Sequence, residues 1–416
     1  MPVEMSGRFP RYTEYDPAVP VWCVTPGEGR AFHRFFDTSP ISPSGRFIVF
    51  TRMPAEDRLP EPGEAAEVVV VSLTTGEEAV VAETRGWDTQ LGAQAQWGAD
   101  DTELFFNDMA PATWRPFGVR LDPLTGRWSK LDGTVYMVSR DGRTAASPCL
   151  LRAGLTQAGY GVVAPPEHVP RNHGAADDDG VCVTDTRTGQ CRLLASFARI
   201  VEEAEPRLDP AAYAGGTFYG AHVKWTRDGR RLMLVLRWLP DDGGPRNAHV
   251  VTMNADGSAI HIAISADQWD KGGHHPDWCP DGEHVMMNLK LDGHTLRLVR
   301  ARTDGTGLAT MTDAVLGSGH PSLHPNGRHV IADSYPGEPV AFGDGTTPIR
   351  LIDLAEGTAT DLVRIRTVPP VSGPNNELRV DPHPAWDRAY RRVAFNACPD
   401  GTRRVYVADL SSLLDA

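Results

Sequence analysis

The stretch HPDWCPDG at residues 275–282 decides the fold, because variants of it return along the chain. HVKWTRDG stands at residues 222–229, HPSLHPNG at 320–327 and HPAWDR at 383–388. Each copy places a histidine three residues before a large apolar residue, and the three longer copies place it seven residues before a glycine. Repeated units fold alike, so equivalent positions reach equivalent places in space. The four histidines are therefore expected to converge.

Weaker copies of the motif lack the histidine and begin at Thr38, Gln94 and Val135, which gives seven units in all. A run rich in Val, Ile and Leu follows the turn of each unit, and it is weakest in the third. Most units then show a second apolar run that ends in an Asp-Gly, Thr-Gly or Glu-Gly pair. Short apolar strands separated by such pairs are typical of hairpins. Two hairpins a unit predict an all-β fold, a seven-bladed β-propeller of four-stranded antiparallel blades.

The two ends of the chain are expected to close the ring. The last unit ends at Val405–Leu410, which would be its third strand. The segment Val19–Val24 can supply the fourth, and pairing it there removes an exposed sheet edge. We therefore predict one propeller domain over residues 1–416, with an insertion at about 152–178 over one face and a short helix within Ile200–Ala214.

Composition narrows the function. The formal net charge of −13 argues against a nucleic-acid partner, which would require a basic surface. No apolar run is long enough for a signal peptide or a membrane span, so we expect a cytoplasmic protein. The six cysteines are scattered, which favours reduced thiols. No P-loop, HExxH or GxSxG motif is present, so the common hydrolase signatures are missing.

The repeated positions divide into structural and chemical ones. The motif tryptophans are expected to pack between blades, and the glycines to form turns. A single histidine on a channel-lining strand is more often a hydrogen-bonded spacer than a ligand, but four at one register indicate a shared site that binds metal or moves protons. Gln94, at the same register, can add an oxygen ligand or contact a substrate. Such a mixed set suits manganese, zinc, iron or nickel.

The motif resembles that of oligogalacturonate lyases and related seven-bladed polysaccharide lyases, a group that includes ulvan lyases. The resemblance rests on HPDWCPDG at 275–282, GHPSL at 319–323, and DPHPAW at 381–386 followed by VAFN at 393–396. It covers most of the chain from about residue 30 onward. TolB-type propellers share the Trp and Asp-Gly positions, so only the histidines discriminate between the two groups.

The resemblance implies a manganese ion that binds the carboxylate of a uronate substrate, with a basic residue nearby to remove a proton. By position, His275 and His383 would be metal ligands, with His320 completing the set. Leu378 stands where the family has a glutamine and cannot bind metal, so the shell must differ or be filled by His320 or Gln94. Asp381 stands at a histidine position and can still bind metal through its carboxylate.

We therefore expect a metal-dependent lyase that cleaves uronic-acid-containing oligosaccharides by β-elimination, with His222 as the base and Arg237 as the clamp on negative charge. Arg237 can equally be a solvent-facing charge. The expected partner is an acidic oligosaccharide, with no nucleic acid and no membrane. Two alternatives stay open: a non-catalytic TolB-type propeller that serves as a scaffold or sensor, and a metal-dependent hydrolase or epimerase.

Overall fold

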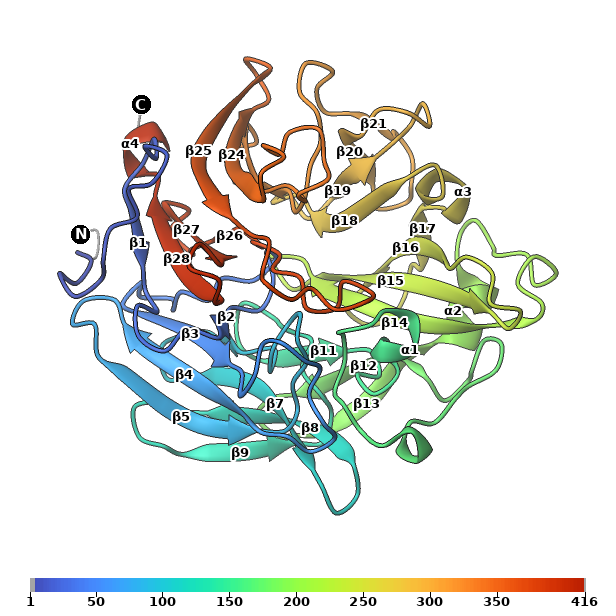
Figure 1. The fold of residues 1–416 in the computed structure, drawn as a ribbon. Coiled ribbons are helices and arrows are strands. Elements are labelled where there is room, and N and C mark those ends of the chain that lie inside the picture. The colour runs from blue at the N-terminus through green and yellow to red at the C-terminus, as the bar shows by residue number, and fades with distance from the viewer. Residues whose placement is uncertain (1–3, 415–416) are drawn as a thin grey trace.

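The predicted propeller is confirmed by a computed structural model, which describes residues 4–414. Within that part of the chain, seven four-stranded antiparallel sheets surround one axis (Figure 1). Blade 1 contains β2 (Ala31–Phe32), β3 (Phe47–Arg52), β4 (Ala66–Ser72) and β5 (Glu78–Thr84). Blade 2 contains β6 (Gln96–Trp97), β7 (Leu104–Ala110), β8 (Arg115–Leu121) and β9 (Trp128–Leu131). Blade 3 contains β10 (Met137–Val138), β11 (Thr144–Ser147), β12 (Gly180–Asp185) and β13 (Cys191–Ser196).

The remaining blades follow the same order from the axis outward. Blade 4 contains β14 (Gly216–Trp225), β15 (Arg231–Pro240), β16 (Asn247–Asn254) and β17 (His261–Ile264). Blade 5 contains β18 (Gly273–Trp278), β19 (His284–Leu289), β20 (Arg297–Arg302) and β21 (Ala309–Thr310). Blade 6 contains β22 (Ser322–Leu323), β23 (His329–Ala332), β24 (Thr346–Asp353) and β25 (Thr358–Arg366). Blade 7 contains β26 (Ala385–Trp386), β27 (Arg392–Ala397) and β28 (Arg404–Asp409), and β1 (Val21–Cys23) completes it.

Helices are short, as expected. They are α1 (Ala153–Thr156), the 3-10 helix η1 (Pro166–His168), α2 (Phe197–Glu203), α3 (Ala266–Trp269) and α4 (Ser411–Leu414). The segment predicted as an insertion carries α1 and η1, and α2 begins three residues before the predicted helix. No helix of the described residues combines the length and the apolar character needed to cross a bilayer.

The ring closes through the N-terminal segment, as the sequence predicts. Strand β1 pairs antiparallel with β28, with Val21 opposite Ala408. A hydrogen bond near the axis also joins the last blade to the first. The side chain of Asn396 accepts it from the backbone N–H of His33 at 2.9 Å. Equivalent asparagines on β7 and β19 bond to the backbone of the following blade. The prediction of one domain includes residues 1–3 and 415–416, which lie outside the described residues, and it stays a prediction.

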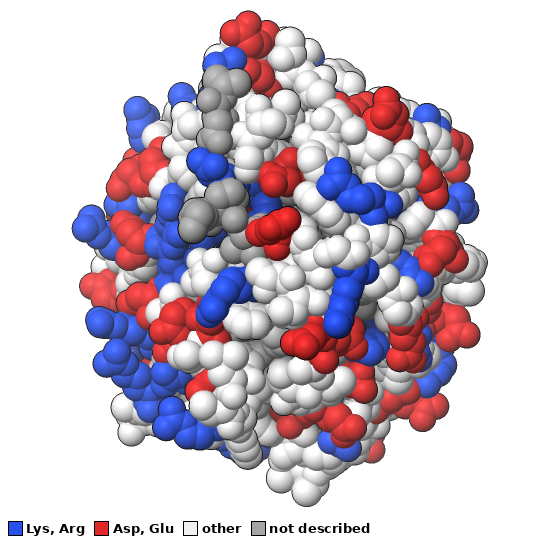
Figure 2. Space-filling model, turned by 90° about the vertical axis from the view of Figure 1, so that its left-hand side faces the viewer, with Lys and Arg blue, Asp and Glu red and all other residues white. Residues whose placement is uncertain are grey.

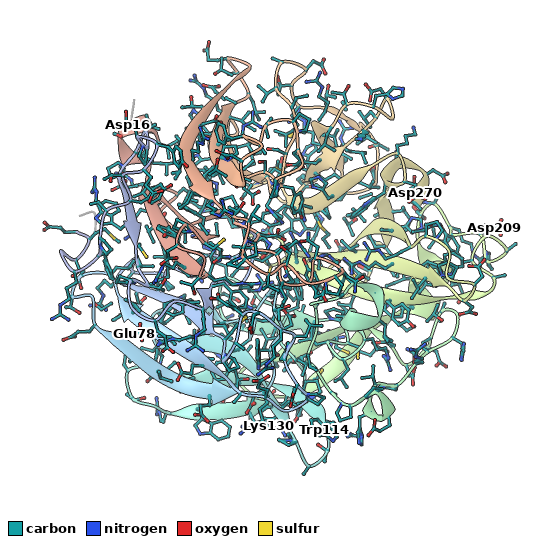
Figure 3. The ribbon with its side chains drawn as sticks, in the orientation of Figure 1. Asp16, Glu78, Trp114, Lys130, Asp209 and Asp270 are labelled. Carbon is teal, nitrogen blue, oxygen red and sulfur yellow. The ribbon has the colours of Figure 1, made fainter. Side chains whose placement is uncertain are left out.

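The motif tryptophans join neighbouring blades. The indole N–H of Trp97 donates to Pro40, that of Trp278 to Lys224 and that of Trp386 to Ser322, in each case to a backbone carbonyl of the preceding blade. The indole rings are buried in the apolar layers between blades. Each one therefore satisfies a polar group while it removes apolar area from water. At the outer rim the chain is polar, as Asp16, Glu78, Asp209 and Asp270 show (Figure 3). Acidic and basic side chains are interspersed on the side seen in Figure 2.

Blade 1 departs from the sequence prediction. The repeat was expected to begin at Thr38, but the innermost strand of the blade is β2, which ends at Phe32. Phe32 pairs with Thr51 on β3. The next pair along the inner edge of blade 1 is an isolated bridge between Ile41 and Ile48, outside β2. The segment 33–40 therefore loops out of the sheet into the channel. The sequence concealed this loop because blade 1 has neither the histidine nor the tryptophan of the motif.

Candidate metal centre

Two of the motif histidines, His222 and His275, stand at irregularities of the innermost strands. In β14 the pairing with β15 moves from Ala221 directly to Lys224, so His222 belongs to a β-bulge. Strand β18 shifts in the same way around His275. The backbone is left-handed at these positions, with φ of 49° at His222, 58° at His275, 49° at His383 and 59° at Gln94. Non-glycine residues rarely adopt this conformation, and bulges re-aim side chains. The repeated bulge turns these side chains into the channel.

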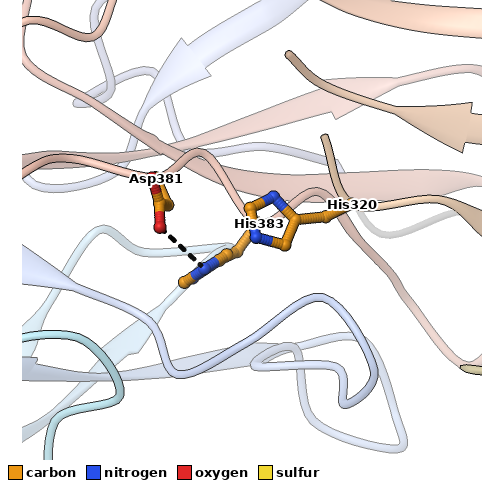
Figure 4. Close-up of side chains that lie close together, drawn as sticks. All are labelled: His320, Asp381 and His383. Carbon is orange, nitrogen blue, oxygen red and sulfur yellow. Dashed lines mark ion pairs between the residues drawn. The ribbon is translucent and has the colours of Figure 1, made fainter. Parts of the chain in front are cut away.

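Three of the predicted residues converge. The side-chain ligand atoms of His320, Asp381 and His383 all lie within 4.8 Å of one another (Figure 4). His320 and His383 are each 1% exposed, and Asp381 is 5% exposed. The Nε2 atom of His383 is 3.7 Å from a carboxylate oxygen of Asp381. Segments some 60 residues apart in the chain thus supply two imidazoles and one carboxylate to a single buried point.

Three of the four imidazole nitrogens in this cluster have no hydrogen-bond partner. The carboxylate of Asp333 lies 2.9 Å from Nδ1 of His320 and accepts its proton, which leaves the lone pair on Nε2. That Nε2 atom has no hydrogen-bond partner, and neither ring nitrogen of His383 has one. An unsatisfied buried polar atom costs about 1–3 kcal/mol. A carboxylate that orients an imidazole with a free nitrogen is the usual surrounding of a metal-bound histidine. Two imidazoles and a carboxylate therefore fit a transition-metal ion.

Asp333→Asn tests this orientation. An amide can donate to Nδ1 of His320, which would move the imidazole proton to Nε2 and block the lone pair. We expect metal affinity to fall about 10- to 100-fold, measured by equilibrium dialysis. Asp353→Asn removes a surface carboxylate that pairs with Arg328 and is expected to leave affinity unchanged. Equal affinities in the two variants would rule out the orienting role of Asp333.

His275 lies beside this cluster but outside its tightest group. Its ring centroid is 3.8 Å from that of His320. Its Nδ1 atom is 2.8 Å from the carbonyl of Gly319 and donates to it, so Nε2 carries the lone pair. The hydroxyl of Tyr335 is 3.2 Å from that Nε2. The Nε2 lone pair of His275 next to the cluster therefore accepts from Tyr335, and its role as a ligand stays a prediction.

His222 and Arg237, chosen as a catalytic pair, are neighbours. The Nη2 atom of Arg237 is 3.3 Å from Nε2 of His222. A guanidinium can only donate, so Nε2 accepts, and Nδ1 donates to the hydroxyl of Tyr136 at 2.7 Å. Burial, with Arg237 as the next cause, holds the pKa of His222 well below its usual range. His222 is therefore a neutral imidazole with its lone pair facing a cation. Burial also lowers the pKa of Arg237 to about 9.

The two predicted oxygen donors, Gln94 and Asp381, both have protein partners. The side-chain oxygen of Gln94 accepts a hydrogen bond from Nε of Arg34 at 2.8 Å, so this oxygen is already engaged. Asp381 accepts from Nε of Arg379 at 2.8 Å, which keeps its carboxylate in place beside His383. Leu378, at the position of the family's glutamine, is buried at 2% exposure. The oxygen ligand that the cluster offers to a metal is therefore Asp381, because the side-chain oxygen of Gln94 is bonded to Arg34.

The loop of blade 1 brings side chains that the repeat pattern missed. His33 is 1% exposed, and its ring lies beside the backbone of Pro382 and His383 without a well-formed hydrogen bond. Burial lowers its pKa to about 3. The ring centroid of Phe35 lies 4.6 Å from that of His383 and 5.2 Å from that of His222. Phe35 thus packs against the rings of His222 and His383 and shields them from water on that side.

Acid stability provides a second test, on a histidine of blade 4. His249 is 2% exposed, and its Nδ1 accepts from the backbone N–H of Ala266 at 3.1 Å. Burial lowers its pKa to about 4. The unfolded state therefore binds the extra proton first as pH falls below about 6.5, and stability is lost from there downward.

We expect His249 to contribute about 1 kcal/mol of destabilisation in metal-free protein between pH about 7 and pH about 5.5. The measurement is urea unfolding at both pH values. His249→Gln should reduce the difference, and His294→Gln, at an exposed position, should not. A pH difference that is the same in both variants would contradict the assignment.

Comparison with known proteins shows the fold. No family model and no curated protein matches the chain. A solved structure described as oligogalacturonate lyase in complex with manganese is 15% identical, with a TM-score of 0.65 over 97% of this chain and 96% of that one. An oligogalacturonate lyase from Vibrio parahaemolyticus is 15% identical, with a TM-score of 0.64 and 96% of both chains covered. The propeller domain of the Trilobed protease from Pyrococcus furiosus is 12% identical, with a TM-score of 0.51 over 91% of this chain and 96% of that one. These propellers share the architecture, and at such identities the similarity extends to the fold alone.

Proposed function

We propose that this protein is a metal-dependent lyase that cleaves uronic-acid-containing oligosaccharides by β-elimination. The observation that carries the proposal is the set of unpartnered imidazole nitrogens on His320 and His383 beside the carboxylate of Asp381. A neutral histidine and an arginine, His222 and Arg237, lie close to this set. The shared fold with oligogalacturonate lyases supports the proposal, as does the manganese described for one of them.

The donor set favours a divalent transition metal. His320, His383 and Asp381 would hold it, with His275 as the nearest further ligand. Manganese is our first choice, since it accepts mixed nitrogen and oxygen ligands, and zinc is the second. When bound, the cation would neutralise the uronate carboxylate and so make the adjacent C–H bond more acidic.

The side chains around the cluster can move the protons of the reaction. On substrate binding, Arg237 would turn from Nε2 of His222 to the substrate, and that Nε2 would then accept the proton next to the substrate carboxylate, while the Nδ1–H bond to Tyr136 keeps the ring in place. The electron pair left behind forms the ring double bond, and the glycosidic C–O bond at the neighbouring carbon breaks. Arg237 is oriented by Gln157 at 2.8 Å and Thr156 at 3.0 Å and stabilises the negative charge that develops.

A proton donor for the departing oxygen is also at hand. Burial raises the pKa of Tyr160 and that of Tyr335, so both phenols stay protonated. The ring of Tyr160 lies 6.2 Å from that of His222, between centroids. Tyr335 lies on the other side of the cluster, at His275. Either hydroxyl can return a proton to the leaving group, which completes the elimination without a change in the net number of protons.

Two connecting segments cover the site and favour a short substrate. The connection after β25 crosses the middle of the ring (Figure 1). It meets the blade 3 insertion where Arg379 donates to the hydroxyl of Tyr160 at 3.1 Å. Thr89 donates to the carbonyls of both Gly159 and Glu377 and so ties the two segments together. These contacts must open to admit a sugar, and a cover of this kind suits an oligosaccharide better than the middle of a polymer.

The experiment is incubation of the metal-loaded protein with pectic, ulvan-type and glycosaminoglycan oligosaccharides. We expect one class to give unsaturated sugars that absorb in the ultraviolet, and a chelator to stop the reaction until metal is restored. Flat absorbance with all three classes, with metal bound, would overturn the lyase. The protein would then be better described as a binding scaffold or sensor.

A further inference from the structure

A cavity lies farther along the channel than the candidate metal centre, on the other side of Phe36. Its volume is about 170 Å³, and Trp225, Trp278 and Trp386 are part of its lining. These residues follow the histidine register by three positions, which is about 10 Å along a strand. Phe36 lies between the candidate metal centre and this cavity. Its ring centroid is 5.3 Å from that of His320, and its side chain also lines the cavity. The cavity is therefore separate from the candidate metal centre.

Three arginines line this cavity: Arg140, Arg227 and Arg388. Within residues 4–414 none of them forms an ion pair. Arg388 donates only to backbone carbonyls, among them that of Trp97 at 3.2 Å. Arg227 lies over the ring of Tyr390 at 4.9 Å. Arg140 approaches the backbone of Arg388, and burial together with Arg140 lowers the pKa of Arg388 to about 10. Like charges gathered without a counter-ion attract an anion.

The carboxylates that line the same cavity are already neutralised. Asp387 pairs with Arg392 at 3.0 Å. Asp37 pairs with Arg34 and with Lys224, and Asp277 lies 3.5 Å from Lys224. The carboxylates that line the cavity therefore do not neutralise the three arginines, and only the more distant charges of Asp100 and Asp101 act on Arg388, in a chain whose formal net charge is −13.

We propose that this cavity binds a small oxyanion, a phosphate or carboxylate group, through the guanidinium groups of Arg140, Arg227 and Arg388. Planar guanidinium groups match such anions with paired N–H donors. The volume of about 170 Å³ is large enough to admit a phosphate ion or one sugar-acid ring. Trp225, in the same lining, has an indole N–H without a hydrogen-bond partner. The site does not depend on the metal centre or on its proposed reaction.

Calorimetric titration of metal-free protein with inorganic phosphate and, separately, with a monomeric hexuronate tests the site. We expect at least one anion to bind, and the stronger of the two identifies the group that the cavity accepts. The double variant Arg140→Gln/Arg227→Gln should weaken binding at least about tenfold. Arg230→Gln, which removes one charge from a side chain that is 82% exposed, is the matched control and should leave binding unchanged.

Three results would overturn the proposal. One is the absence of binding of both anions to the wild-type protein. Another is an equal loss in Arg230→Gln, which would indicate general electrostatic attraction. The third is loss of binding in His383→Ala with all three cavity arginines intact, which would place the anion at the metal centre. Matching thermal unfolding of the double variant and the wild type confirms that the fold is retained.

Discussion

His383→Ala is expected to remove the bound metal. Wild-type protein should purify with, or take up, about one equivalent of a transition metal, and the variant should bind it at least about 100-fold more weakly. The reason is geometric: His383 supplies a buried imidazole with no other partner, at the point where Asp381 and His320 meet. Removing it leaves two ligands, one of them a carboxylate already held by Arg379. Elemental analysis after dialysis against a fixed free-metal concentration measures the change.

A matched variant separates this effect from general damage. His324→Ala removes a histidine of the preceding repeat, at 320–327, that lies outside the register and contacts Tyr390 instead. It should keep the full metal content. If both His383→Ala and His324→Ala keep the full metal content, the cluster is not the metal site. His383→Gln, with a side chain of similar size, is the second form of the variant in case the alanine protein does not fold.

His222→Gln is expected to abolish most of the lyase activity while the metal content stays unchanged. Loss of a general base costs about 10²- to 10⁴-fold in rate. His222 is the neutral imidazole whose lone pair faces Arg237, and it is not in the group of closest ligand atoms. Initial rates of ultraviolet-absorbing product at saturating metal measure the loss.

His275→Gln is the comparison that assigns the roles. If His275 is a ligand, this variant should lose metal affinity and recover part of its rate at high metal concentration. If instead His275→Gln is inactive with metal in place and His222→Gln is active, the base is His275, whose Nε2 lone pair lies beside His320. The two variants therefore distinguish an error in the assignment of the base from an error in the proposed lyase reaction.

The blade count was predictable because the motif recurs in every blade, and in three of them its tryptophan makes the same contact. The motif tryptophan donates to the preceding blade at Trp97, Trp278 and Trp386, and so its spacing marks the blades. Closure by the N-terminal strand followed from the missing fourth strand of the last unit, and β1 supplies it. In blade 1 the predicted motif register holds, with Ile41 opposite Ile48, but strand β2 and the loop at 33–40 were missed, since no local pattern signals where the strand leaves the sheet.

The candidate site could be predicted only in part. The histidine register was visible, but the left-handed bulges that aim these side chains depend on pairing with the second strand. Asp333 was missed because its significance lies in the contact with His320, which precedes the neighbouring strand β22. Tyr136 follows Val135 by one position and was one residue away from the register. His33 and Phe35 come from the unpredicted loop.

An anomalous-difference map of metal-soaked crystals tests the central claim most directly. The claim is that the ring brings His320, Asp381 and His383 to one metal ion. The map is expected to show one strong peak, at the absorption edge of the bound metal, among their three side chains. Crystals with no peak there, or with the peak at other side chains while these three stay unliganded, would contradict it.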